Sequence, residues 1–149
     1  MVPILDLLRQ GITPEKIALS IALGVVLGVF PMLGSTTILC TGMAILLGLN
    51  LPAIQLVNFL IYPLQLILFL PLLKAGSRIA NAAPVTISLG QVFAMIQSDL
   101  WGLIKMLWTA TLGAIAIWLV LAPIAAAAIY FTLAPLLRRA YRAIHHTSV

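Results

Sequence analysis

Residues 17–50 read IALSIALGVVLGVF PMLGSTT ILCTGMAILLGL N, which is two apolar runs separated by a break at residues 31–37. As a helix, the first run (17–30) extends about 21 Å and the second run (38–49) about 18 Å. The hydrocarbon core of a bilayer is roughly 30 Å thick, so neither run crosses it alone. The fold therefore depends on what the chain does at this break.

The residue types at the break end one helix and begin another. Pro31 lacks an amide proton and disfavours a helical conformation at Phe30, while Gly34 tolerates a positive φ. Ser35 or Thr36 can cap a new helix. We therefore predict helix, break, helix, with the two halves able to form a tight hairpin. Non-helical backbone inside a membrane is tolerated only where protein or a water-filled cavity satisfies it, so the break is buried or lines a site.

The composition is typical of an integral membrane protein. Of the 149 residues, 63% are hydrophobic and only 7% are charged, whereas soluble domains average roughly 25% charged residues. The 8 Lys and Arg residues outnumber the 3 Asp and Glu residues. These cations flank apolar segments and form no stripe with interleaved aromatic residues, so we expect no nucleic-acid partner.

Small residues predict how the first half-helix packs. Thr13-Pro14 is a strong helix start, with Thr13 as the cap and Pro14 at the first helical position. Ser20, Gly24 and Gly28 then recur every four residues, which gives a smooth face for close helix packing.

The second apolar stretch, Pro52–Leu73, contains Pro63 at its centre, so we predict another bent, broken or re-entrant element. Gln55, Asn58, Tyr62 and Gln65 share an arc of about 80° on it, at 100° per residue. These side chains could bind a head group or line a polar path, since polar groups at membrane depth seldom face lipid. The alternative is interhelical hydrogen bonding, for instance to Thr37 and Thr41.

The C-terminal half predicts an interfacial helix followed by a hairpin. Residues 85–100 mix apolar and polar side chains at helical spacing, as a surface helix does. Residues 101–121 form the cleanest span, Ala122-Pro123 is expected to turn the chain, and a last helix continues to about residue 144. The predicted fold is a single all-α polytopic domain over residues 1–149, with two proline-broken or re-entrant hairpins, an interfacial helix and a C-terminal transmembrane hairpin.

The distribution of positive charge predicts the topology. If both broken stretches return to their starting side, all the cations lie on one side, which should be the cytoplasm. These cations are Arg9, Lys16, Lys74, Arg78, Lys105, Arg138, Arg139 and Arg142.

Several short motifs resemble one bacterial membrane family. They are Thr13-Pro14-x-x-Ile17-Ala18, Gly24-x-x-x-Gly28-x-Phe30-Pro31-x-x-Gly34-x-x-Thr37, Leu49-Asn50-x-Pro52, Tyr62-Pro63 and Gly76-x-x-Ile79. The chain is similar in these to the family named domain of unknown function 2062, from about Thr13 to Ile79 and more loosely beyond. The family usually has Asn-Pro at Tyr62-Pro63, and Asn58 lies one turn earlier. The resemblance implies a small multi-pass inner-membrane protein, sometimes joined to glycosyltransferase domains.

Two further sets of residues are candidate binding sites. At the break, free backbone amides with the hydroxyls of Ser35, Thr36 and Thr37 suit a phosphate or carboxylate, with Gly34 allowing close approach; alternatively the hydroxyls only cap the helix. Arg138, Arg139 and Arg142 are topology determinants or bind anionic lipid head groups. We expect no metal site at His145-His146, because an adjacent pair lacks a defined ligand geometry.

Catalysis is not expected, because the few carboxylates lie at predicted interfaces and no nucleophile has a visible base. No cofactor is expected either. Our first hypothesis is a carrier-like or lipid-handling protein that binds an anionic group at the broken helices. The alternative is a non-catalytic scaffold that packs through Gly24 and Gly28 on itself or on a glycosyltransferase partner. We expect membrane lipids as partners and a homo-oligomer.

Overall fold

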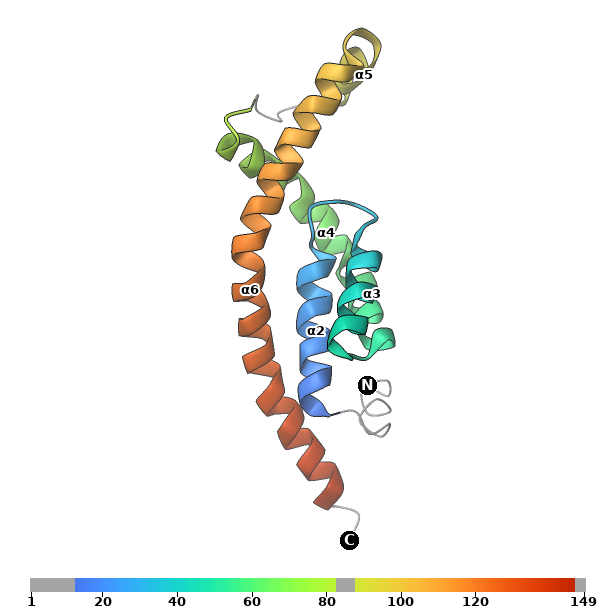
Figure 1. The fold of residues 1–149 in the computed structure, drawn as a ribbon, viewed down its shortest axis with the longest axis vertical. Coiled ribbons are helices and arrows are strands. Elements are labelled where there is room, and N and C mark those ends of the chain that lie inside the picture. Colours follow the sequence, from blue (N-terminus) through green and yellow to red (C-terminus); the bar gives the residue numbers. More distant parts are fainter. Residues whose placement is uncertain (1–12, 83–87, 147–149) are drawn as a thin grey trace.

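The computed structural model describes residues 13–82 and 88–146, and the described residues form five helices and no strand (Figure 1). The predicted all-α fold is confirmed. The helices are α2 (Pro14–Gly28), α3 (Thr36–Leu47), α4 (Leu51–Ile79), α5 (Leu89–Ser98) and α6 (Leu100–His146).

Helices α2 and α3 form the hairpin around the break, and they lie side by side in Figure 1. Thr13 caps α2 by accepting a hydrogen bond from the Lys16 amide. At the other end of the hairpin, Gly48 closes α3 in the left-handed conformation, with φ of 60°. Lys16 Nζ donates to the Gly48 carbonyl at 3.2 Å, so the start of α2 and the end of α3 lie at the same level.

The second stretch is not a hairpin, and this prediction is wrong. Helix α4 is one continuous helix of 29 residues that contains both Pro63 and Pro71. The difference from Pro31 lies in the residues that follow. Gly34 turns the chain with φ of 86° after Pro31, whereas apolar helix-forming residues follow Pro63 and nothing there begins a new helix.

The predicted C-terminal hairpin is also wrong. Helix α6 runs for 47 residues through Pro123 and Pro135 without a turn. Four alanines at 125–128 follow Pro123, and alanine has the highest helix propensity of all residues. A proline costs one backbone hydrogen bond, and here the surrounding helix-forming sequence keeps the helix intact.

The two continuous helices change the predicted topology. Helix α4 carries Lys74 and Arg78 away from the end where Lys16 lies, and α6 returns to that end, where Arg138 pairs with Glu15. The cations are therefore divided between the two ends of the molecule, contrary to the one-sided arrangement; Arg9 lies outside the described residues. The basic end, as we call it, comprises Lys16, Arg138, Arg139 and Arg142 with Glu15.

Helix α5 begins later than predicted, at Leu89, and residues 85–87 of the predicted interfacial helix lie outside the described residues. Ser88 and Gln91 form a capping box at its start. None of its residues is buried, and Phe93 is 65% exposed. In Figure 1 it lies beside the start of α6, at the opposite end from the basic end.

The small-residue face of α2 packs on α4. Ser20, Gly24 and Gly28 are all buried. A Cβ on Gly24 would lie 2.8 Å from Val57 Cβ, and one on Gly28 would lie 3.1 Å from Ile61 Cγ2. Because α4 of the same chain already covers this face, Gly24 and Gly28 are not open to a docking partner, and the scaffold hypothesis itself stays a prediction.

Helices α4 and α6 cross at two glycines. A Cβ on Gly76 would meet the backbone of Ala110 and Ala114, and a Cβ on Gly113 would meet the backbone of Gly76. Around this point Leu73, Ala110 and Ala114 form a small buried cluster. The absence of both side chains is what allows the helices to cross in contact.

Two helices, α4 and α6, are long and apolar enough to cross a membrane. Only 17% of the most apolar window of each is buried, whereas the core helix of a soluble protein would be mostly buried. Large apolar side chains such as Leu60 and Ile67 are about 70% exposed, at 69% and 70%. These surfaces favour lipid rather than water as the surrounding solvent.

We expect Gly113→Ala to lower the stability of the folded protein in detergent by about 1–3 kcal/mol, because its Cβ overlaps the α4 backbone. The matched control is Gly42→Ala on α3, where a Cβ meets nothing within 4 Å. That change should be neutral or stabilising, since alanine favours a helix by about 1 kcal/mol over glycine. Thermal unfolding followed by circular dichroism measures both; equal effects would show that the crossing is not tight.

Candidate functional site

The break between α2 and α3 is a compact turn held by its own backbone. Phe30 N donates to Leu27 O at 3.1 Å, Met32 N donates to Phe30 O at 2.8 Å, and Ser35 N donates to Met32 O. Pro31 is fully buried, whereas Met32 and Leu33 are exposed. The turn ends at Gly34, where the positive φ lets the chain reverse into α3.

The predicted ligand-binding hydroxyls are partly used within the fold. Ser35 occupies the N-cap position of α3 but makes no side-chain cap bond, and its Oγ donates to Met32 O at 2.8 Å. Thr36 is buried and Thr37 is exposed. The Thr37 carbonyl accepts hydrogen bonds from Thr41 Oγ1 and from Gln55 Nε2 on α4.

Three of the four polar residues on α4 face the hairpin. Gln55 Nε2 donates to Thr37 O at 3.1 Å and to Thr41 Oγ1 at 2.8 Å, and Asn58 Nδ2 donates to Gln55 Oε1 at 3.3 Å. Asn58 is 4% exposed, in contrast to Tyr62 at 47%. Asn58 rather than Tyr62 therefore places a polar group against α2, beside Gly28.

Gln65 is the most deeply buried of these residues, at 1% exposure. Its Nε2 donates to the carbonyl of Phe30 at 2.9 Å, on the opposite side of the break from Gln55. Its Oε1 has no donor among the described residues. The Gln65 side-chain amide thus fixes the backbone at Phe30, immediately before Pro31. Pro31 itself has no amide proton with which to make a backbone hydrogen bond.

Trp118 on α6 is the functional residue that the sequence did not point to. Its Nε1 donates to Val26 O at 3.0 Å, and its ring meets Phe30 edge to face with centroids 4.9 Å apart. The Val26 carbonyl needs this donor because the Phe30 amide bonds to Leu27 O instead. A Trp within an apolar stretch is the available signal, because buried indole N–H groups usually have a partner.

Comparison with known proteins assigns the chain to one family. A family model described as "Uncharacterized protein conserved in bacteria (DUF2062)" matches residues 3–146. The chain belongs to this family. The match extends well beyond the motifs at 13–79, and it confirms the resemblance. No curated protein and no solved structure matches the chain.

An apolar crevice of this DUF2062 chain could hold a ligand. It has a volume of about 310 Å³ and lies between α2, α4 and α6. Its lining is apolar: Val25, Val26, Val29, Leu68, Leu72, Trp118, Leu121, Ala122 and Ala125. A hydrocarbon chain fits such a lining, and an anion does not.

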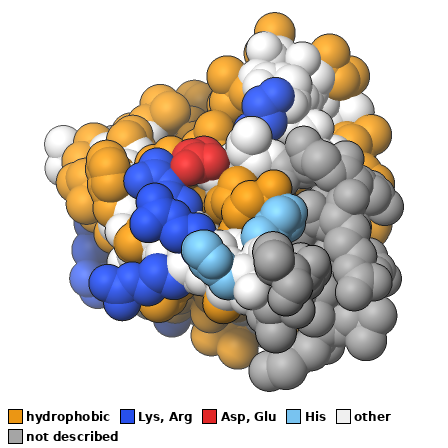
Figure 2. All heavy atoms as spheres, turned by 90° about the horizontal axis from the view of Figure 1, so that it is seen from below, with side chains coloured by type: hydrophobic (Ala, Val, Ile, Leu, Met, Phe, Trp, Pro, Cys, Tyr) orange, Lys and Arg blue, Asp and Glu red, His pale blue; other side chains and the backbone are white. Residues whose placement is uncertain are grey.

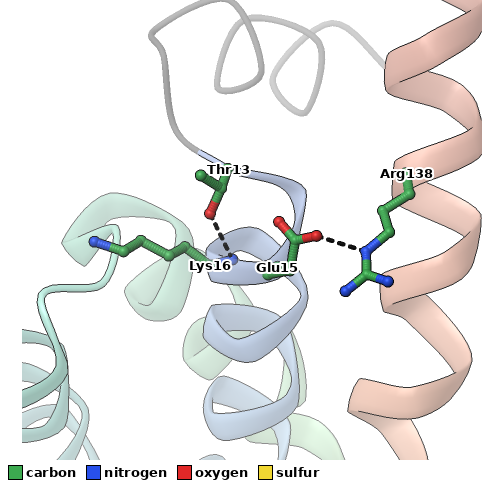
Figure 3. Close-up of polar contacts among 4 residues, drawn as sticks. All are labelled: Thr13, Glu15, Lys16 and Arg138. Atoms are coloured by element: carbon green, nitrogen blue, oxygen red, sulfur yellow. Dashed lines mark hydrogen bonds and ion pairs between the residues drawn. The ribbon is translucent and has the colours of Figure 1, made fainter.

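At the basic end, Glu15 on α2 pairs with Arg138 on α6 (Figure 3). The backbone amide at the helix start, and then Arg138, lower the pKa of the Glu15 carboxyl. Lys16 points to the other side of α2 in Figure 3, toward α3. Figure 2 views this end from below and shows Lys and Arg side chains gathered beside apolar surface. Arg139 and Arg142 are exposed there and make no ion pair among the described residues.

We expect Trp118→Phe to lower the stability of the DUF2062 chain by about 1–2 kcal/mol, because it leaves the Val26 carbonyl without a donor. Trp108→Phe is the control, since Trp108 is 59% exposed and no hydrogen bond to its indole is present among the described residues. Unfolding midpoints in one detergent compare the two variants. A loss as large for Trp108→Phe would contradict the role given to the Trp118 hydrogen bond.

Proposed function

We propose that the protein is a non-catalytic, multi-pass protein of the bacterial inner membrane that binds an anionic lipid. The acyl chain lies in the crevice between α2, α4 and α6, and the phosphate lies against Arg139 and Arg142. The observation that carries the proposal is that crevice and cations follow one face of α6.

The periodicity of α6 aligns the crevice with the basic end. Ala125 lines the crevice, and Thr132 and Arg139 follow it at intervals of seven residues, which brings each back to nearly the same side of the helix. A shallow apolar hollow of Ala128, Ile129, Thr132 and Leu133 lies between them. Arg142 lies one helical turn beyond Arg139 and about 60° round the helix from it at 100° per residue, at the edge of this face.

The distances suit one lipid molecule. From Ala125 to Arg139 is 14 residues, or about 21 Å along a helix. A bilayer with its head groups is about 40–45 Å thick, so one leaflet measures about 20–22 Å. A lipid whose phosphate contacts Arg139 thus has its chain end at the level of the crevice.

The same lengths support a transmembrane placement. Lys105 beside Trp101 and the arginines from Arg138 onward lie near opposite ends of α6, about 50 Å apart along the helix axis. A tilted helix of that length matches the bilayer with its head groups. The α2–α3 hairpin then enters from the basic end and returns to it, and the positive-inside rule assigns that end to the cytoplasm.

The break is less suited to an anion than the basic end. Ser35 Oγ and the Gln55 amide already bind carbonyls or hydroxyls of the hairpin. A phosphate placed there would lie near Met32 and Leu33, which are apolar, and burying an uncompensated charge is costly. The hydrogen bonds at the break support a structural role for these groups.

Filling the crevice tests the acyl-chain site. In a W101F/W108F background Trp118 is the remaining tryptophan, and it lines the crevice, so lipids with brominated chains should quench it on contact. We expect Ala122→Leu, which fills the crevice, to reduce this quenching severalfold. Ala127→Leu lies outside the crevice lining and should leave quenching unchanged. Equal quenching in both variants would rule out the crevice as the chain site.

Neutralising the cations tests the head-group site. We expect Arg139→Gln with Arg142→Gln to reduce the preference of Trp118 quenching for brominated phosphatidylglycerol over phosphatidylcholine by roughly thirtyfold, since each of the two cations near anionic lipid contributes about 1 kcal/mol. Arg138 is left intact because it pairs with Glu15. Lys74→Gln with Arg78→Gln, at the other end of α4, is the control and should keep the preference. An unchanged preference in the arginine variant would contradict the proposal.

A further inference from the structure

A second apolar crevice lies on the other side of the hairpin tip. It has a volume of about 290 Å³ and is lined by Pro31, Met32, Leu33, Phe69, Ile104, Leu107, Trp108 and Thr111. We call it the upper crevice, and the one described above the lower crevice. Val29 lines the lower crevice and Pro31 the upper one, so the tip separates them.

Both crevices use the same face of α6. The upper one is lined by Ile104, Leu107, Trp108 and Thr111, and adding fourteen to each number gives Trp118, Leu121, Ala122 and Ala125 of the lower one. Fourteen residues return to within about 40° of the starting direction, and they rise about 21 Å. With Arg139 at one membrane surface, the lower crevice begins about 21 Å from it, near the middle of the bilayer, and the upper crevice lies beside Lys105, near the opposite surface.

Cations also flank the upper crevice. Trp101 precedes Trp108 of the crevice lining by seven residues, so it continues the same face of α6 toward the N-terminus of that helix. Lys105 Nζ lies 5.6 Å from the centroid of the Trp101 ring. Arg78 is exposed near the end of α4, in the turn that follows the crossing at Gly76. Asp99 is the carboxylate at this end, and its Oδ1 accepts a hydrogen bond from Gly102 N. Lys105 directly follows Ile104 of the crevice lining, and an apolar crevice with an ammonium this close along the chain complements an anionic lipid.

We infer that the protein binds two anionic lipids at once, one from each leaflet, with the hairpin tip between their chains. The inner-leaflet lipid is the one proposed above, and the inference rests on that function for the class of ligand. The second lipid lies with its chain in the upper crevice and its phosphate at Lys105. Phe30 and Pro31 keep the two chains apart, so the α2–α3 hairpin separates the two sites and need not bind a ligand itself.

The two sites can be read separately with tryptophan and brominated lipid. The full chain is reconstituted in mixtures of phosphatidylcholine and phosphatidylglycerol, with only the phosphatidylglycerol brominated in one sample and only the phosphatidylcholine brominated in the other. Trp118 alone reports in W101F/W108F, and the difference between W101F and W101F/W108F gives the quenching of Trp108. Lys105→Gln is made in both backgrounds. Thr111→Phe fills the upper crevice, and Thr109→Phe is its matched control, because both threonines bond to a carbonyl four residues earlier and Thr109 lies outside the lining.

We expect phosphatidylglycerol to quench Trp108 in preference to phosphatidylcholine, and Lys105→Gln to reduce this preference about fivefold without changing that of Trp118. Thr111→Phe should reduce Trp108 quenching, and Thr109→Phe should not. A lipid preference at Trp118 with none at Trp108 overturns the second site and leaves the proposed function standing. No preference at either tryptophan overturns both.

Discussion

The backbone at the α2–α3 break must find hydrogen-bond partners away from water, and the rest of the structure supplies them. Helix α2 ends at Gly28, so the carbonyls near its end lack the usual helical donors. Trp118 of α6 donates to Val26 O, whose helical donor is missing. Gln65 of α4 adds a second donor to Phe30 O beside the Met32 amide, and Gln55 of α4 donates to Thr37 O at the start of α3. The α2–α3 hairpin therefore depends on the two long helices to supply donors at its tip.

This dependence explains why so small a chain has a defined arrangement. Apolar contact alone discriminates weakly between helix positions in lipid, because lipid tails are as apolar as leucine. The three side-chain donors fix the height of the hairpin against α4 and α6, and the glycine contacts at Gly24 and Gly76 bring the backbones close enough for those donors to reach. The ion pair of Glu15 with Arg138 is exposed and contributes little to the stability of the fold. It shows that the start of α2 lies beside Arg138 of α6.

The sequence predicted those parts of the fold whose causes are local. The break at 31–37 follows from a proline, a glycine and a serine in order, and α2 and α3 formed on either side of it. The same reasoning failed at Pro63 and Pro123, because a proline ends a helix only where a turn-forming glycine or a capping residue follows it. The link between Trp118 and Val26 joins residues 92 positions apart. No local pattern contains that pairing, so the side chain that completes the break could not be assigned from the sequence.

The geometry also explains why the polar residues singled out in the sequence lie away from the proposed lipid sites. Gln55, Asn58 and Gln65 face the hairpin and take up backbone and hydroxyl groups that lipid cannot satisfy. Because those groups are already hydrogen-bonded, the surfaces that line the two crevices are mainly apolar. Trp118 belongs to both systems, since its N–H completes the break while its ring forms a wall of the lower crevice. Under the proposed function, a lipid chain lying against that ring would contact the residue that holds the hairpin tip.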